Sequence, residues 1–280
     1  MIERAKKIVQ DFRTKKSTFT EQNLINILRE YLQVLILKFI YQSKHGASLS
    51  FMGGTCLRIC YDLKRYSEDL DFAFDDKKQS YRFSNLMRDL ERRLTLSGFT
   101  VEHLEHEDKT VQKGFLRFSN IAKTFDFKSF RNDQKLHIKL EVDTNPIPLK
   151  RRERESFFVN RFQEIFPILK HNLPTLFAGK ILAILQRPYD RGRDYYDLIW
   201  YLSQNASLNV NYLNRGFSKK KFKNNQEVFF AVKEKISQIK PQILLKDINR
   251  FLEDPNETSW ILRFEELYDQ LIQAYHPKSK

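Results

Sequence analysis

A glycine turn and a pair of carboxylates form the part of this sequence best suited to chemistry. The chain reads Gly-Gly-Thr at 53–55 and Asp-Leu-Asp-Phe at 69–72. In an extended strand, residues i and i+2 lie on the same face, so Asp69 and Asp71 can bind one metal ion together. Glycine lets the backbone approach a ligand closely, and the amino end of a helix attracts phosphate. A phosphate-binding turn facing hard oxygen ligands is what Mg²⁺-dependent chemistry on a nucleoside triphosphate requires.

A third acidic residue would complete a site for two metal ions, the arrangement that serves in-line phosphoryl transfer. The segment 137–143, His-Ile-Lys-Leu-Glu-Val-Asp, alternates like a strand and places Glu141 and Asp143 on one face. We expect Asp143, at the end of this strand, to be the third ligand, with Glu141 as the alternative. For either residue, the competing interpretation is an ordinary exposed acid on a strand.

Hydrophobic patterns predict the elements that position these residues. Apolar residues over 24–39 predict a helix that begins near Thr20, and short apolar runs predict strands at 49–52 and 69–74. The next expected elements are a helix over 81–97 and strands near 100–103, 113–119 and 137–142. This order predicts a mixed sheet with helices packed on it, which is an α+β fold.

The character of the sequence changes after Pro148. Helical patterns dominate from Pro174 onward, at 174–187, 191–204, 219–237, 242–253 and 258–274. We therefore expect two domains. A catalytic core that includes the first helix would occupy residues 1–150, and a mainly helical domain over 151–280 would complete the active-site cleft.

The bulk properties favour a polyanionic partner and a protein that does not enter a membrane. The formal net charge is +14, which favours nucleic acid first and a membrane surface second. No apolar run approaches the roughly 20 residues that span a bilayer, and the N-terminus lacks a signal-peptide pattern. The only cysteines, Cys56 and Cys60, are four residues apart on an expected helix, where a disulfide is unfavourable. We expect a cytoplasmic protein.

Three motifs between about residues 50 and 200 occur in one order. They are Gly-Gly-Thr at 53–55, Arg65-x-Ser67-x-Asp69-Leu70-Asp71-Phe72, and Lys180-x-x-Ala183-x-x-x-Arg187 followed by Arg193-Asp194-x-x-Asp197-Leu198. Together they resemble the AbiEii/AbiGii toxin family, whose members have the nucleotidyltransferase fold of the minimal nucleotidyltransferases and DNA polymerase beta. The glycine turn followed by the two aspartates is common to the whole superfamily. The block at 180–198 occurs in fewer proteins and points to this family.

The resemblance implies a role for each matched position. Gly53, Gly54 and Thr55 would form the nucleotide-binding turn, Asp69 and Asp71 would bind Mg²⁺, Lys180 would neutralise triphosphate charge, and Asp194 would be a later catalytic acid. Arg65 and Ser67 would orient the aspartates or touch phosphate, or else serve only the turn. The competing interpretation of the 180–198 block is an amphipathic helix pair with an Arg–Asp salt bridge.

We therefore expect a Mg²⁺-dependent nucleotidyltransferase, with Mn²⁺ as the alternative cofactor, that transfers a nucleoside monophosphate from an NTP to an acceptor and releases pyrophosphate. The positive charge favours RNA, for instance the 3′ end of a tRNA, as the acceptor. The resemblance implies a toxin of a toxin–antitoxin or abortive-infection system, neutralised by a separately encoded antitoxin. The alternatives are an inactive nucleic-acid-binding protein on the same fold and a metal-dependent nuclease using the same carboxylates.

Overall fold

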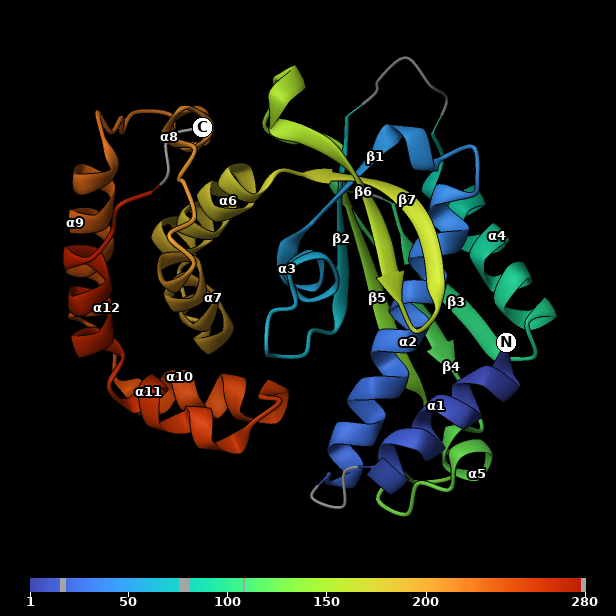
Figure 1. Ribbon diagram of the computed structural model, residues 1–280. Coiled ribbons are helices and arrows are strands. Elements are labelled where there is room, and N and C mark those ends of the chain that lie inside the picture. The colour runs from blue at the N-terminus through green and yellow to red at the C-terminus, as the bar shows by residue number, and fades with distance from the viewer. Residues whose placement is uncertain (16–18, 76–80, 108, 278–280) are drawn as a thin grey trace. The chain divides into compact units, whose positions relative to one another are not determined.

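The computed structural model of the protein describes residues 1–15, 19–75, 81–107 and 109–277 (Figure 1). The chain divides into two compact units that each combine separate stretches of sequence. Unit 1 comprises Met1–Asp62, Tyr66–Pro146 and Ser156–Lys170, and unit 2 comprises Leu63–Arg65, Ile147–Glu155 and His171–Lys280. Unit 1 contains nearly all of a mixed sheet, and unit 2 is mainly helical. The expected α+β fold class, with helices dominating the C-terminal half, is confirmed.

The central strand of the sheet, β2, carries both Asp69 and Asp71. The seven strands lie in the order β3-β4-β5-β2-β1-β7-β6. Their bounds are β1 (Leu49–Met52), β2 (Asp69–Phe74), β3 (Val101–His106), β4 (Val111–Phe118), β5 (Leu136–Asp143), β6 (Arg154–Arg161) and β7 (Glu164–His171). Strand β2 runs antiparallel to β1 and parallel to β5, so it is hydrogen-bonded on both edges. A strand held on both sides gives the aspartates a rigid support.

The two faces of the sheet differ in polarity because polar and apolar residues alternate along its strands. In β5 the apolar residues at 136, 138, 140 and 142 are buried, whereas the polar residues between them are exposed or half-buried. Helix α4 (Phe83–Leu96) packs on β3 and β4. A Cβ at Gly114 of β4 would overlap Met87 of this helix, so glycine permits the close approach on the apolar face. The acidic residues therefore line the opposite, more open face.

The remaining helices of unit 1 surround this sheet. They are α1 (Ile2–Lys15), α2 (Glu21–Tyr41), α3 (Gly53–Tyr61) and α5 (Ile121–Phe125). Thr20 caps α2, as its side chain accepts a hydrogen bond from the Asn23 N–H, which confirms the predicted start of this helix. Within the described ranges, no helix is long and apolar enough to cross a membrane.

Strands β6 and β7 are elements that the sequence pattern did not predict. Apolar residues on their exposed faces, such as Phe158 and Ile165, hide the alternation that marks a half-buried strand. The turn between the strands has positive φ at Phe162 (52°) and Gln163 (60°), where a hairpin usually has glycine or asparagine. Neither the alternation nor the turn residues therefore signal the hairpin.

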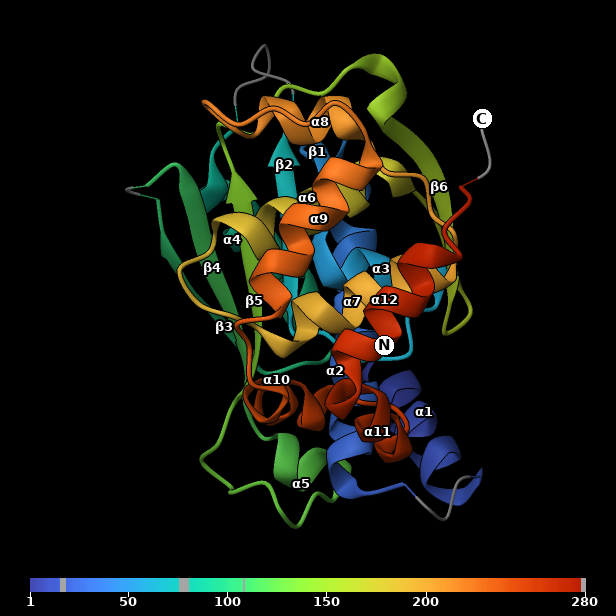
Figure 2. The ribbon, with the colours of Figure 1, turned by 90° about the vertical axis from the view of Figure 1, so that its left-hand side faces the viewer.

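Unit 2 is organised around α7, which packs against α6, α10 and α12. Its main helices are α6 (Leu173–Gln186), α7 (Gly192–Ser203), α8 (Val210–Arg215), α9 (Asn225–Ile236), α10 (Pro241–Ile248), α11 (Thr258–Leu262) and α12 (Phe264–Gln273). A Cβ at Gly192 would overlap the backbone carbonyl of Leu244, so this glycine allows α7 and α10 to meet. Helices α9 and α12 lie side by side, joined by a 2.6 Å ion pair between Lys233 and Asp269 (Figure 2).

Candidate active site

The glycine turn lies directly against one carboxylate of the aspartate pair. Gly53 begins α3 with φ +79°, a conformation that side chains other than glycine rarely adopt. The residue before it, Met52, is paired with Asp71 in the antiparallel ladder of β1 and β2. A Cβ at Gly53 would overlap the Asp71 carboxylate, so both backbone and space require glycine here. The turn and the acid therefore form one structural feature.

Thr55 connects this turn to the strand of the aspartates. Its side chain is fully buried, and its hydroxyl donates a hydrogen bond to the backbone carbonyl of Asp69. The bond ties α3 to β2 and gives the hydroxyl a structural partner, so its contact with a triphosphate stays a prediction. The first N–H groups of a helix lack acceptors within the helix. The start of α3, at Gly53 and Gly54, is therefore the part of the turn suited to an anion.

The strand register determines which further acid lies beside the pair. Asp71 is paired with Glu141 of β5, and Asp143 is paired with Ala73. Paired residues on neighbouring strands project to the same face, so Glu141 is the direct neighbour of Asp71 and Asp143 lies one step farther along. Asp143 accepts a 2.9 Å hydrogen bond from the N–H of Asn145 at the strand end. Both candidates for the third acid share the face of the aspartates.

Two lysines hold the Glu141 carboxylate. Its Oε1 lies 2.6 Å from Lys139 Nζ and 3.3 Å from Lys113 Nζ. Burial raises the pKa of Glu141, but the hydrogen bond and charge of Lys139, together with Lys113, outweigh burial and lower the pKa below its usual value. Glu141 is therefore an ionised carboxylate at neutral pH, already balanced by cations.

The donor set on this face fits a divalent cation of the Mg²⁺ type. Asp69 and Asp71 are half-buried hard oxygen donors on one face of a fixed strand, next to a turn that leaves no room for a Cβ. In the part of the chain that the structure describes, no group of three or more His, Cys, Asp or Glu residues is arranged to hold a metal ion. Glu141 would have to leave its lysines to join the pair. The third ligand, Asp143 or Glu141, stays a prediction.

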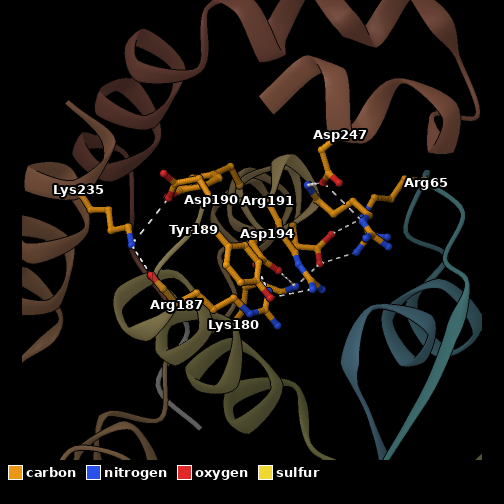
Figure 3. A network of polar contacts seen from close by, with 12 residues as sticks. Arg65, Lys180, Arg187, Tyr189, Asp190, Arg191, Asp194, Lys235 and Asp247 are labelled. Carbon is orange, nitrogen blue, oxygen red and sulfur yellow. Dashed lines mark hydrogen bonds and ion pairs between the residues drawn. The ribbon is translucent and has the colours of Figure 1, made fainter. Parts of the chain in front are cut away.

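Polar residues of the 180–198 block form a buried ionic network with Arg65 in unit 2 (Figure 3). Lys180 Nζ lies 2.7 Å from Asp194 Oδ1 and 2.7 Å from Asp197 Oδ2, so one ammonium bridges both acids of α7. Arg65 donates two hydrogen bonds to Asp197, of 2.6 and 2.7 Å. Arg187 pairs with Asp194, which is the Arg–Asp salt bridge of the competing interpretation. Lys180 and Asp194, for which the resemblance implies separate roles, thus form an ion pair with each other.

Burial makes this network a strong electrostatic feature. The side chains of Arg65 and Asp197 are only 2% and 0% exposed. Burial lowers the pKa of Arg65, but the charge of Asp197 outweighs burial and raises the pKa above its usual value. Burial likewise raises the pKa of Asp194, whereas Lys180 and Arg187 bring it below the usual value. Arg65 and Asp194 are therefore charged at neutral pH.

Asp197 is the residue to which sequence reasoning assigned no role. It belongs to the Arg-Asp-x-x-Asp block, in which i and i+3 lie on one face of a helix. That spacing was a usable signal that Asp194 and Asp197 share a cation. The structure places Arg65 on Asp197, so contact of Arg65 with a nucleotide stays a prediction. The backbone carbonyl of Ser67 accepts a 3.0 Å hydrogen bond from Gln33, and the proposed phosphate contact of Ser67 also stays a prediction.

The mixed sheet, the glycine turn and the paired aspartates define a protein of the nucleotidyltransferase class. A family model described as nucleotidyl transferase AbiEii toxin, type IV TA system, matches residues 35–279, and the chain belongs to this family. This confirms the family resemblance of the sequence motifs. Two solved structures have a fold similar to that of this chain, which supports the expected fold.

Two solved structures share this fold at low sequence identity. JHP933 from Helicobacter pylori is 18% identical with a TM-score of 0.55, over 89% of this chain and 93% of that chain. The structure named "putative nucleotidyltransferase from H. pylori" is 18% identical with a TM-score of 0.54, over 92% of this chain and 100% of that chain. No curated protein matches the sequence. At this identity the two structures support the fold alone.

Proposed function

We propose that the protein is a Mg²⁺-dependent nucleotidyltransferase that transfers a nucleoside monophosphate from an NTP to an RNA acceptor, with a tRNA 3′ end as the preferred example. The observation that carries the proposal is the contact between the Gly53 turn and Asp71, on the strand face shared with Asp69. It brings a helix start suited to an anion next to two carboxylates suited to a cation. Membership of the AbiEii family supports the reaction class and implies an antitoxin partner.

The residues of unit 1 would divide the work of this reaction. The N–H groups at the start of α3 would bind the triphosphate, and Asp69 and Asp71 would hold Mg²⁺, which neutralises phosphate charge and activates the acceptor hydroxyl when bound. The hydroxyl oxygen would form a bond to the α-phosphorus while the bond to pyrophosphate breaks. A β5 carboxylate would orient this hydroxyl and receive its proton. The roles of Lys180 and Asp194 in unit 2 stay as expected from the family.

The register favours Glu141 as the β5 carboxylate, in place of the Asp143 expected from the end of the strand. Glu141 is the direct neighbour of Asp71, and its lysines would be released when a cation takes their place. Glu141→Gln is therefore expected to abolish transfer, and Asp143→Asn to leave most of it. The reverse result in a side-by-side transfer assay would assign the role to Asp143.

A labelling experiment tests the reaction itself. The protein is incubated with Mg²⁺, each labelled NTP in turn and total RNA, and we expect label on RNA that depends on Asp69 and Asp71. Label on neither RNA nor protein, or an Asp69→Ala variant as active as the native chain, would contradict the proposal. RNA shortening would instead support the nuclease. RNA binding with steep salt dependence and no turnover would support the inactive binding protein.

Growth provides a separate test of the toxin role. Expression of the native chain is expected to arrest growth, and the Asp71→Asn variant is expected to be tolerated, because the proposed toxicity depends on nucleotidyl transfer. Co-expression of the companion antitoxin should restore growth to cells that carry the native chain. Equal arrest by the native chain and the variant, at equal expression, would separate toxicity from the carboxylate pair.

A further inference from the structure

A cavity of about 290 Å³ adjoins Asp69 on the open face of the sheet. Its walls include Arg29, Asp69, Phe115, Lys135, His137 and Lys139, all in unit 1. The register places Asp69, Lys139 and Phe115 in one row across β2, β5 and β4. The glycine turn lies at the end of β1, which pairs with the opposite edge of β2. The aspartate pair thus has a phosphate-binding turn on one side and a cavity on the other.

We propose that this cavity binds the 3′-terminal nucleotide of a single-stranded RNA acceptor. The inference rests on the proposed nucleotidyl transfer and assigns its second substrate to named residues. In-line transfer places the attacking hydroxyl opposite the departing pyrophosphate. With the triphosphate at the turn beside Asp71, the acceptor approaches from the side of Asp69 and β5. The cavity occupies that side.

The charges of the cavity suit a phosphate backbone. Its basic side chains Arg29, Lys135 and Lys139 outnumber its acids, Glu68 and Asp69. Lys135 Nζ and Lys139 Nζ each have a partner outside the cavity, Glu102 at 2.7 Å and Glu141 at 2.6 Å. Cations that are held by neighbouring carboxylates are already oriented when phosphate arrives. The cavity therefore offers positioned positive charge beside the proposed reaction centre.

His137 adds a hydrogen-bonding group that is neutral at physiological pH. Burial lowers its pKa, and the nearby charges of Arg117, Lys135 and Arg29 lower it further, against a smaller opposite effect of Glu102. A neutral imidazole both donates and accepts hydrogen bonds, as the polar edges of a base or a ribose hydroxyl require. The same group of cations that lowers this pKa attracts the phosphate of the RNA.

The size and the aromatic wall select a single unpaired nucleotide. Phe115 is half-buried on the cavity face, where a base can stack on its ring. A volume of about 290 Å³ is just below the roughly 300–1,000 Å³ that small-ligand pockets span. A cavity of this size suits no more than one nucleotide, and it excludes a base-paired helix. The cavity therefore favours an unpaired RNA end.

Binding of a fluorescent single-stranded RNA with a free 3′ hydroxyl, measured without NTP, tests the inference. Phe115→Ala is expected to weaken binding about tenfold, because base stacking is lost. Lys135→Gln is expected to reduce the slope of log K against log salt by about one. The matched controls are Phe158→Ala, an exposed phenylalanine of β6, and Lys123→Gln, an exposed lysine of α5. Neither control residue lines the cavity, and both variants should bind like the native chain.

Transfer kinetics distinguish this inference from the proposed function. The cavity variants should raise the KM for RNA and leave the KM for NTP unchanged. If the native chain labels RNA but cavity and control variants behave alike, the cavity is not the acceptor site. Label on protein would overturn the RNA acceptor, whereas cavity-dependent RNA binding without any transfer would support the RNA site and contradict the proposed function. Phe115→Leu, with a melting curve, replaces Phe115→Ala if the latter does not fold.

Discussion

The acidic pairs of the two units differ in their exposure to solvent. In unit 1, Asp69 and Asp71 are half-buried on an open sheet face, beside a glycine turn and a cavity. In unit 2, Asp194 and Asp197 are buried at 5% and 0% exposure and are held by Lys180 and two arginines. Acids that must bind a cation from solution need access, whereas acids that fix helices need permanent partners.

The comparison separates two uses of the same residue types. Removing two charges from water is costly, and the attraction inside the protein offsets that cost only with good geometry and further hydrogen bonds. The two hydrogen bonds of Arg65 to Asp197 and the bridge from Lys180 provide both. We therefore expect the contacts of Asp197 with Arg65 and Lys180 to position α6 and α7, and the Asp71 pair to serve chemistry; the family roles of Lys180 and Asp194 stay predictions. Four measurements test this division.

Asp71→Asn is expected to have the largest effect, and on activity alone. If Asp71 is a metal ligand as proposed, its loss should reduce nucleotidyl transfer by on the order of a thousandfold, since a bound cation contributes several kcal/mol to the transition state. The melting temperature should change little, because asparagine is close to aspartate in size and fits the same strand position. Transfer assays with labelled NTP and a thermal melt check both. A strong loss of stability with retained activity would reverse the comparison.

Asp197→Ala is expected to act on stability. Arg65 and Lys180 would lose a buried partner, and leaving a buried charge uncompensated costs about 3–5 kcal/mol. Urea unfolding followed by circular dichroism measures the loss. The matched control is Asp133→Ala, which removes a 3.7 Å ion pair between Arg131 and a carboxylate that is 81% exposed. Surface pairs contribute about 0–1 kcal/mol, so equal effects of the two variants would show that the network is not special.

Gly53→Ala is expected to reduce both nucleotidyl transfer and stability, transfer by less than Asp71→Asn and stability by less than Asp197→Ala. The positive φ and the overlap with Asp71 should cost about 1–3 kcal/mol of stability and displace the carboxylate from its position. Gly179→Ala is the control, because among the described residues no atom lies within 4 Å of a Cβ added there. In the interior of α6 this control should stabilise by about 0.5–1 kcal/mol. Full activity of Gly53→Ala would mean that the turn tolerates a side chain.

Acid should weaken the unit 2 network through Asp194. Its folded-state pKa lies below the usual value, so its contribution to stability is full above the pKa of an unfolded aspartate, about 3.9. The contribution is lost as the pH falls through the lower folded value. The difference in unfolding free energy between the native chain and Asp194→Asn should therefore shrink between pH 5 and pH 2. A difference that stays constant over this range would contradict the assigned ionic role.

Local patterns in the sequence were sufficient to predict the strands that carry the candidate metal ligands. The alternation in 69–72 predicts a strand with both aspartates on one face, and the structure has that strand as β2. The alternation over 137–143 likewise corresponds to β5. The hairpin of β6 and β7 was missed because its exposed apolar residues and its glycine-free turn carry no local signal. Periodicity reports which face is buried only when the other face is polar.

The sequence by itself determined the family and predicted the central residues of its site, since a glycine turn followed by two acids at i and i+2 is a local pattern. Only the tertiary structure decided which residues meet across the chain. It set Glu141 beside Asp71 through the register of two parallel strands, and it joined Arg65 to Asp197 across 132 positions. It also brought β2, β4, β5 and α2 together around the cavity next to Asp69. Such pairings depend on register and long-range packing, which no local spacing encodes.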